Sequence, residues 1–294
     1  MASHSNVALV TGASTGIGRA TALALHRAGL ITCATARRTE AIADLKAQGL
    51  RTFQLDVTDE TSMMTALRQV EHEAGPIAVL VNNAGYGLNG PAEELDLREV
   101  RREFETNVFG LLRMSQLVLP GMRHGGWGRI INVGSIGGTF TAPGAGAYHA
   151  SKYAVEALSD AMRYEVQRFG VDVVLIQPTG VYTPFFAKIN DTMRDTGADS
   201  PYAAFKDNLA QLTTRMHTGR GSYGLVTADD VAKVIVAAVR ARRPRTRYKV
   251  GLSAHIYAGV RRILSDRMWD RVMGWQLPMQ PLGTTARTAP PRSP

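Results

Sequence analysis

Cysteine is almost absent from this chain of 294 residues, in which Cys33 is the only one. A single thiol can form no disulfide within the chain, so the fold is not a disulfide scaffold and a reducing compartment is favoured. Cys33 lies among apolar residues. This setting predicts a buried structural thiol rather than a catalytic or metal-binding one.

Long apolar runs are missing too. The sequence contains no run of about eighteen apolar residues, so we expect no transmembrane helix. The first residues, MASHSNVALVTG, lack the basic region and apolar stretch of a secretory signal. The hydrophobic fraction of 45% still permits a sizeable core. Together these features predict a cytoplasmic protein.

Motifs for hydrolytic chemistry are also lacking. The seven histidines are scattered without metal-ligand spacing, and neither HExxH nor GxSxG occurs. These absences argue against a metal hydrolase and against a serine hydrolase with a nucleophile elbow. We therefore expect no metal site.

Lysine and arginine together outnumber aspartate and glutamate, which gives a net charge of +9 at pH 7. The basic excess is mostly arginine and includes the cluster RARRPRTR, from Arg240 to Arg247. Such a cluster can bind nucleic acid or an anionic membrane. No aromatic residues interleave with these arginines, and a solvated connection between a helix and a strand is the favoured interpretation. We expect no nucleic-acid partner, and peripheral membrane contact is not favoured.

Apolar segments alternate with helical patterns along most of the chain. This alternation predicts an α/β fold, a doubly wound (Rossmann) parallel sheet of about seven strands with helices on both faces. The expected strands are residues 7–10, 30–35, 51–55, 78–81, 129–133, 171–177 and 247–250, and the expected helices are 17–27, 40–48, 60–73, 98–119, 148–169 and 229–242.

Two regions fall outside the alternation, although residues 1–282 are predicted to form a single domain. Residues 184–224 mix apolar with polar residues, which predicts a substrate lid; permanently packed surface helices are the alternative. Residues 253–276 have amphipathic spacing and predict a C-terminal helical extension. Residues 283–294 are small, polar and proline-rich, which predicts a disordered tail.

A glycine-rich turn, TGASTGIG, follows the first expected strand directly. Gly12, Gly16 and Gly18 stand where backbone turns tightly or approaches a ligand. The helix that begins near Ile17 would direct its free N–H groups at a pyrophosphate. The strand before the turn and the helix after it supply the context that a dinucleotide-binding loop requires.

A tyrosine and a lysine are spaced four residues apart at Tyr148 and Lys152, so both lie on one helix face. An adjacent ammonium is expected to lower the pKa of a phenol toward the working pH. Alone this pair is a weak signal. Ser135, thirteen positions earlier, follows an apolar strand at the sheet edge where such folds bind ligands. Its hydroxyl is placed to bind a substrate carbonyl.

These motifs resemble, in content and in order, those of the short-chain dehydrogenase/reductase family. The resemblance covers roughly residues 6 to 250 and rests on TGASTGIG, on Asp56 and Val57, on NNAG (82–85), on Asn107 and Ser135, and on YHASK (148–152).

The resemblance implies a role for each matching residue. Asn107 would order a water in a proton relay to Lys152, Ser135 and Tyr148 would bind the reacting oxygen, and Lys152 would bind the nicotinamide ribose. Asp56 and Val57 would contact the adenine. The full set of expected cofactor-binding residues is Gly12, Ser14, Thr15, Gly16, Ile17, Gly18, Arg37, Arg38, Asp56, Val57, Asn83, Ala84, Gly85, Tyr148, Lys152, Val181 and Thr183.

The loop after the second strand indicates which nicotinamide cofactor is bound. Ala36 occupies the position of the acidic residue that usually binds the ribose hydroxyls, and Arg37 and Arg38 follow it. A guanidinium can hold a 2′-phosphate, and no carboxylate is present to repel it. The loop therefore favours NADP(H); the alternative is that both arginines are merely solvated.

One residue departs from the family pattern. Thr179 follows Pro178 where the family usually has glycine, and a β-branched residue rarely adopts a positive φ. The path of this loop beside the nicotinamide is therefore open, although we expect activity to survive.

The sequence predicts an NADP(H)-dependent oxidoreductase that transfers a hydride between nicotinamide and the carbonyl or alcohol of an apolar substrate. The segment QPTGVYTPFF and the C-terminal extension resemble those of hydroxysteroid- and retinol-type reductases. The alternatives are an NADP(H)-binding sensor without turnover, or an epimerase or dehydratase on the same fold. A homodimer or homotetramer is expected, because family members pair the two long helices.

Overall fold

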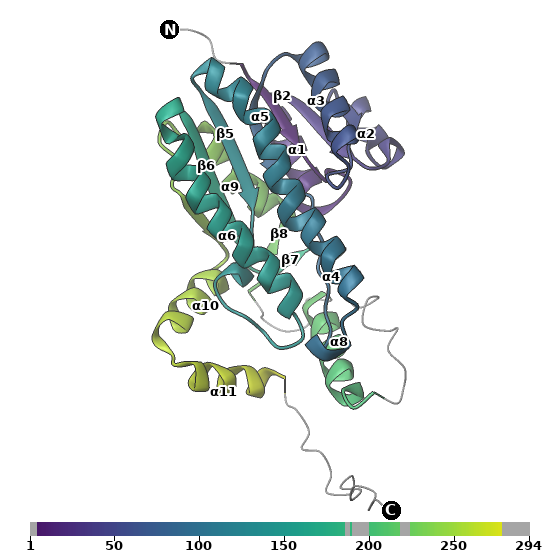
Figure 1. The fold of residues 1–294 in the computed structure, drawn as a ribbon, viewed down its shortest axis with the longest axis vertical. Helices are drawn as coiled ribbons and strands as arrows, with labels where there is room; N and C mark the ends of the chain where they lie inside the picture. Colours follow the sequence, from purple (N-terminus) through teal and green to yellow (C-terminus); the bar gives the residue numbers. More distant parts are fainter. Residues whose placement is uncertain (1–4, 186–188, 190–199, 218–223, 278–294) are drawn as a thin grey trace, which may run out of the picture.

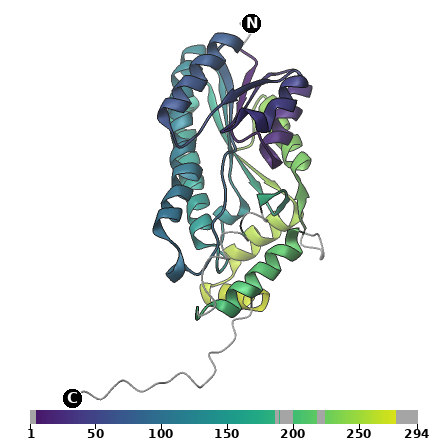
Figure 2. The same ribbon diagram turned by 90° about the vertical axis from the view of Figure 1, so that its right-hand side faces the viewer.

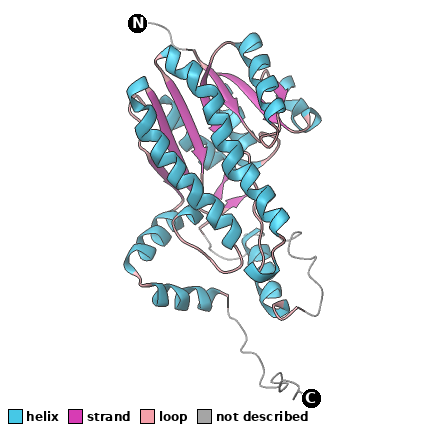
Figure 3. Ribbon diagram, in the orientation of Figure 1, coloured by secondary structure: helices cyan, strands magenta, loops and turns pink. Residues whose placement is uncertain are grey.

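The computed structural model describes residues 5–185, 189, 200–217 and 224–277. Its centre is a seven-stranded sheet in the order β3-β2-β1-β4-β5-β6-β9, in which every neighbouring pair is parallel (Figures 1 and 3). The strands are β1 (Val7–Val10), β2 (Ile31–Ala36), β3 (Arg51–Gln54), β4 (Ile77–Asn82), β5 (Gly128–Val133), β6 (Val171–Pro178) and β9 (Arg247–Val250).

Helices cover both faces of this sheet (Figure 2). The central strands are almost wholly apolar and buried, as expected for strands packed on both sides. One hydrophobic cluster joins the sheet to α1 (Gly16–Arg27), α2 (Ala43–Ala47) and α9 (Ala228–Arg240). A second cluster joins the opposite face to α3 (Glu60–Ala74), α5 (Leu111–Gly125) and α6 (Gly146–Val166). The predicted doubly wound fold is confirmed.

The predicted helix 98–119 is wrong as a single α-helix. The structure divides it into α4 (Leu97–Phe104), a π-helical segment η3 (Glu105–Gly110) and α5, which continues past Pro120. A Cβ at Gly110 would lie 2.5 Å from the Val57 carbonyl oxygen, so the π segment brings backbone unusually close to the loop after β3. The predicted helix 40–48 is likewise a 3₁₀ turn, Thr39–Ile42, followed by α2.

The remaining elements gather at the carboxyl ends of the strands (Figure 1). They are a two-stranded sheet of β7 (Val181–Tyr182) and β8 (Val226–Thr227), and the helices α8 (Ala203–His217), α10 (Leu252–Ile263) and α11 (Asp266–Gln276). Helices α10 and α11 occupy the range of the expected C-terminal extension. The expected lid is described only in part, and the expected tail, 283–294, lies outside the described residues.

In the part of the chain that the structure describes, none of the helices has the length and apolar character needed to cross a membrane.

The arginine-rich segment 240–247 connects α9 to β9, as the favoured interpretation expected. Arg240 donates a hydrogen bond to the Ala28 carbonyl (2.8 Å), and Arg247 forms ion pairs with Glu156 and Asp160 of α6. These two arginines therefore tie helices and strand together, while Arg242 and Arg243 are exposed.

Candidate active site

The order of the strands reverses between β1 and β4, and there the two strand ends are tied together through Thr11. Its hydroxyl accepts hydrogen bonds from the backbone N–H groups of Asn83 and Ala84 (both 3.0 Å). The Asn83 amide in turn donates to the carbonyls of Thr11 (2.9 Å) and Gly12 (3.1 Å). The expected residues Asn83 and Ala84 thus lie against the glycine loop, at the edge where folds of this type bind ligands. Sequence reasoning missed Thr11.

The glycine loop has the geometry of an anion-binding turn. Gly12 and Gly16 have φ angles of +67° and +55°, which disfavour any residue with a side chain. A Cβ at Gly18 would lie 2.3 Å from the Asn83 amide nitrogen, so only glycine fits there. Helix α1 has no side-chain N-cap at Thr15 and no acidic residue in its first turn. Its first N–H groups therefore remain available to a phosphate.

The strand β7 approaches the same loop from the other side of the reversal. A Cβ at Gly16 would lie 3.0 Å from the Thr183 methyl group, so the two backbones are close. Val181, the first residue of β7, is buried. The structure thus brings the expected residue Thr183 next to the glycine loop.

The end of β2 presents the two arginines that were predicted to read the cofactor. Ala36 closes the strand and is buried, whereas Arg37 and Arg38 are exposed. The Asp56 carboxylate, after β3, accepts hydrogen bonds from the N–H (3.0 Å) and hydroxyl (2.8 Å) of Thr58. This carboxylate is therefore held by its own loop, and none of the described residues forms an ion pair with the guanidinium group of Arg37 or Arg38, which suits both groups to a phosphate.

Thr179 adopts no left-handed backbone, because no described residue other than glycine has a positive φ. Its N–H donates to the Val250 carbonyl (3.0 Å), and its hydroxyl lies 2.7 Å from that of Ser253. Thr179 therefore ties β6 to β9 and α10. The question that its β-branched side chain raised about this loop is answered by a backbone that has no positive φ at Thr179.

The hydroxyl and ammonium groups predicted to be catalytic are brought together. Tyr148 and Lys152 lie one turn apart on α6, with the lysine nitrogen 5.8 Å from the centre of the tyrosine ring. Lys152 is buried and donates a hydrogen bond to the Val133 carbonyl at the end of β5 (3.1 Å). The Ser135 hydroxyl hydrogen-bonds the Tyr148 phenol and also accepts from the Gly137 N–H (3.0 Å).

Burial is the largest influence on the pKa values of Tyr148 and Lys152. It raises the pKa of Tyr148 to about 12, and the Glu103 carboxylate adds to the rise while the hydrogen bond from Ser135 opposes it. Burial also lowers the pKa of Lys152 to about 8, against the influence of Glu103. The prediction that Lys152 lowers the Tyr148 pKa is thus wrong for the chain's own groups. The cost of removing a phenolate from water is the largest influence on this pKa.

Asn107 lies in the π segment and is buried. Its amide donates to the Tyr86 carbonyl (2.8 Å) and to the Ser151 hydroxyl (3.0 Å), and its side-chain oxygen accepts from the Tyr86 N–H (3.0 Å). Asn107 therefore holds the loop after β4 against α6, beside Tyr148. π segments occur often at functional sites. The water-ordering role of Asn107 stays a prediction.

A family profile described as short chain dehydrogenase matches residues 6–194, nearly two thirds of the chain. The chain belongs to the short-chain dehydrogenase/reductase family. It is 36% identical to a 3-ketodihydrosphingosine reductase from Bacteroides thetaiotaomicron, over 89% of this chain and 94% of the relative.

Solved structures of this family have the same fold. A short-chain dehydrogenase from Streptomyces avermitilis superposes with a TM-score of 0.76 at 33% identity, covering 94% of this chain and 97% of the other. A serine dehydrogenase in complex with NADP+ superposes with a TM-score of 0.72 at 28% identity, covering 83% of this chain and 94% of the other.

One buried carboxyl group of this short-chain dehydrogenase went unnoticed in the sequence. Glu103 lies one helical turn before Asn107 and is fully buried. Its Oε1 accepts from the Leu88 N–H (3.1 Å), while none of the described residues donates a hydrogen bond to Oε2. Burial raises the Glu103 pKa to about 7. The spacing of four from Asn107, which places both on one helix face, was the available signal.

Apolar side chains pack beside the Tyr148 ring and in a cluster next to it. The ring of Phe185 lies 5.5 Å from that of Tyr148. Phe185 and Ile189 contact the backbone at Gly87, and Phe205 and Leu209 of α8 are buried against the loop at Gly144. The described part of the expected lid is therefore a packed helix and its apolar neighbours.

Proposed function

We propose that this short-chain dehydrogenase/reductase is an NADP(H)-dependent enzyme that interconverts a carbonyl group and an alcohol on an apolar substrate. The observation that carries the proposal is the meeting of Ser135, Tyr148 and Lys152 at the carboxyl edge of the sheet. They lie there beside a glycine loop and a helix N-terminus that are open to an anion.

The three side chains have complementary tasks in this reaction. NADPH, when bound, supplies a hydride to the carbonyl carbon. Ser135 and Tyr148 hold the carbonyl oxygen by hydrogen bonds, and Tyr148 gives it the proton that completes the alcohol. With a pKa of about 12, Tyr148 is protonated at neutral pH and ready to donate. Lys152, close to its ring, would bind the nicotinamide ribose.

Two observations support NADP(H) over NAD(H). Arg37 and Arg38 are exposed at the end of β2, where the acidic residue of an NAD site is replaced by Ala36. The serine dehydrogenase that shares this fold was solved with NADP+. Paired N–H groups of a guanidinium match a 2′-phosphate in charge and geometry.

The surroundings of Tyr148 support an apolar substrate. Phe185, Ile189, Phe205 and Leu209 supply aromatic and aliphatic contacts, and the relative from Bacteroides thetaiotaomicron is named for the reduction of a ketone. We propose a steroid-, retinoid- or fatty-aldehyde-like substrate. A protein that only senses NADP(H) would have no use for the Ser135, Tyr148 and Lys152 set.

The experiment follows NADPH absorbance with the purified enzyme and a panel of steroids, retinoids, fatty aldehydes and quinones. The expected result is turnover of at least one apolar carbonyl, with a preference for NADPH over NADH. Tight NADPH binding with no oxidation by any member of the panel would favour the sensor. Conversion of a substrate without net NADPH consumption would favour the epimerase or dehydratase.

A further inference from the structure

Helix α10 presents its larger apolar side chains to solvent. Leu252, Ile256, Val260 and Ile263 follow one another at helical spacing, and their exposed fractions are 75%, 53%, 36% and 84%. The buried residues of this helix are the small Ala254 and Ala258. A surface helix of a globular protein normally has the opposite arrangement, with the large apolar residues inside. The outward face of α10 is therefore an apolar surface that the described residues leave exposed, which is typical of an interaction site.

Helix α11 repeats this feature. It buries Trp269 and Met273, at 5% and 4% exposed, yet Met268 and Trp275 are 47% and 83% exposed. Trp275 and Met268 are seven residues apart, two helical turns, so they lie on one face. An exposed tryptophan on a face with aliphatic neighbours is typical of helices that lie at the boundary between water and lipid.

Arginines flank both apolar faces. Arg262, Arg267 and Arg271 are exposed, and within the described residues no carboxylate forms an ion pair with any of them. Arg261 differs, because it pairs with Asp266 (2.6 Å). Exposed apolar residues bordered by unpaired guanidinium groups match an anionic lipid surface in both polarity and charge.

The position of α10 and α11 connects this surface to the active site. Phe140, five residues after Ser135, has its ring 5.2 Å from that of Tyr257 and 5.3 Å from that of Trp269. The Trp269 indole donates to the Thr141 carbonyl (3.0 Å). Figures 1 and 2 show both helices at the end of the molecule that also carries α8, opposite the N-terminus.

We propose that the outward faces of α10 and α11 form a surface that binds anionic lipid bilayers. This surface holds the mouth of the active site close to apolar molecules dissolved in the membrane. It consists of Leu252, Ile256, Val260, Ile263, Met268 and Trp275, flanked by the three exposed arginines.

The charge of this surface favours an anionic bilayer over two other partners, the C-terminal residues 278–294 and a second copy of the chain. Residues 278–294 of the chain contain arginine but no acidic residue, so they cannot neutralise Arg262, Arg267 and Arg271. On α10 and α11 the three exposed arginines outnumber the exposed carboxylate of Asp270, so a symmetric pairing with a second copy would bring two net positive faces together. Anionic lipid headgroups supply the missing negative charge.

The test sediments the full-length protein with phosphatidylcholine vesicles, with and without phosphatidylglycerol. We expect binding that requires the anionic lipid and weakens as salt rises. Ile263→Asp should lower the partition coefficient at least about tenfold, because a carboxylate replaces an inserted apolar group. The matched control is Tyr164→Asp, which places the same charge at a 75% exposed apolar position of α6 and should bind as wild type.

A second readout is independent of sedimentation. The tryptophan emission of the wild type should shift to shorter wavelength on addition of anionic vesicles, and Trp275→Phe should remove the shift. Reduction of a water-soluble carbonyl should be unchanged in both Ile263→Asp and Trp275→Phe, which shows that each variant is folded.

Three outcomes overturn the proposal. The first is the absence of vesicle binding by the wild type at low salt, and the second is wild-type binding by Ile263→Asp. The third is that Ile263→Asp alone lowers the oligomeric mass, which would assign the face to a second copy. A variant that ends at Leu277 and binds vesicles when the full chain does not would instead assign the face to residues 278–294.

Discussion

At the scale of single residues, the acid of this site is a phenol that burial keeps protonated. We predict that Tyr148→Phe lowers kcat/KM for carbonyl reduction at least about 10²-fold, because the proton donor is lost. NADPH affinity, measured by fluorescence titration, should stay nearly unchanged. Tyr153→Phe, on an exposed position of the same helix, is the control and should retain activity. Near-normal turnover by folded Tyr148→Phe would contradict the assigned role.

The buried carboxyl of Glu103 predicts a pH-dependent stability. Burial raises its folded pKa to about 7, so the native state favours the neutral acid. The contribution of Glu103 to stability is therefore largest below its unfolded pKa and declines as pH rises toward 7. Glu103→Gln, always neutral, should be more stable than wild type at pH 8 by up to about 3 kcal/mol, and should lose this advantage at pH 4.

Glu103→Gln should also change the pH profile of activity. The Glu103 charge raises the pKa values of Lys152, Tyr148 and Tyr86. Its removal should therefore move the alkaline limb of the kcat/KM profile to lower pH. Glu105→Gln, exposed two residues away, is the matched control and should leave both the profile and the denaturant midpoint unchanged. A purely structural Glu103 would alter stability and leave the profile in place.

The third prediction at this scale concerns cofactor choice. Arg37→Asp should shift the ratio of kcat/KM for NADPH and NADH toward NADH, because a phosphate partner is replaced by a repelling charge. The change should be at least about tenfold, on the scale of one charged hydrogen bond. Arg242→Asp, an equal charge change at an exposed position of the loop between α9 and β9, should leave the ratio unchanged. An unchanged ratio in Arg37→Asp would show that this guanidinium does not read the phosphate.

At the scale of elements, helix α8 is fixed to the turn 92–94 by polar contacts. The Lys206 ammonium is buried and lies 2.5 Å from the Glu94 carboxylate, which also accepts from the Ser200 hydroxyl. The Tyr202 hydroxyl donates to Glu93 (2.6 Å). These contacts fasten one end of the segment that we expect to cover an apolar substrate.

Lys206→Met should loosen this attachment and leave Glu94 without its main partner. We predict faster hydrogen exchange in α8 and a higher KM for an apolar substrate, with kcat for a small soluble carbonyl nearly unchanged. Lys233→Met, which removes an exposed ion pair with Asp230 on α9, is the control. If α8 is a lid, NADP+ and a bulky apolar alcohol together should slow its exchange in the wild type. Equal protection with and without ligands would favour permanently packed helices.

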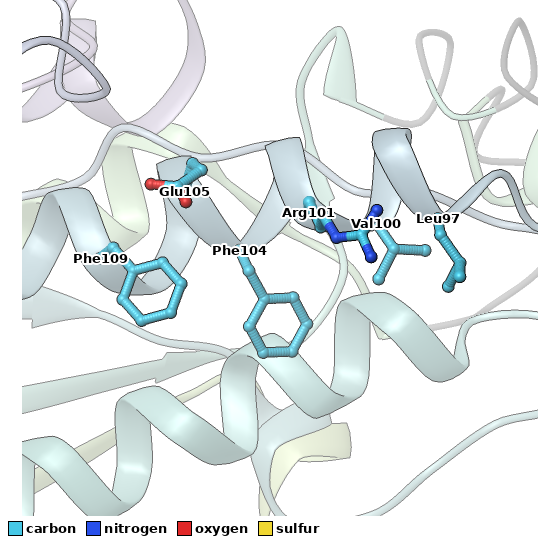
Figure 4. Close-up of a pocket in the computed structure, with 6 residues that line it drawn as sticks. All are labelled: Leu97, Val100, Arg101, Phe104, Glu105 and Phe109. Carbon is cyan, nitrogen blue, oxygen red and sulfur yellow. The ribbon is translucent and has the colours of Figure 1, made fainter.

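At the scale of the whole molecule, the π-helical region leaves an apolar hollow of about 230 Å³ on the surface (Figure 4). It is lined by Leu97, Val100, Arg101, Phe104, Glu105 and Phe109, and its rim residues Leu97 and Phe109 are 64% and 51% exposed. Helix α6, one of the two long helices that family members pair, has an apolar stripe of Val155, Met162 and Val166, which is buried against its own sheet. The hollow, not that stripe, is the surface that we propose for a homodimer.

Phe109→Asp should therefore convert the protein to a monomer at micromolar concentration, as measured by light scattering. Ile263→Asp, which alters the proposed lipid-binding surface, should keep the wild-type mass. A wild type that is monomeric under these conditions would contradict the homodimer.

The sequence predicted much of the fold because its strongest signals are local. Strand β1 has the predicted bounds, since VALV is apolar throughout and meets a glycine turn. Tyr148 and Lys152 share a helix face because their spacing alone requires it. Helix 98–119 was predicted in one piece, because the close approach of Gly110 to Val57 involves a loop far away in the sequence.

The sequence by itself determined the order of strands and helices, the phosphate loop and the family motifs, because periodicity and spacing act between near neighbours. Only the tertiary structure decided which groups are removed from water. Glu103 stands among charged residues of α4, yet packing against α6 and the Leu88 loop buries it. Helix α10 is amphipathic by pattern, yet its larger apolar residues face outward. A periodic pattern distinguishes the two faces of a helix, but distant segments determine which face is covered.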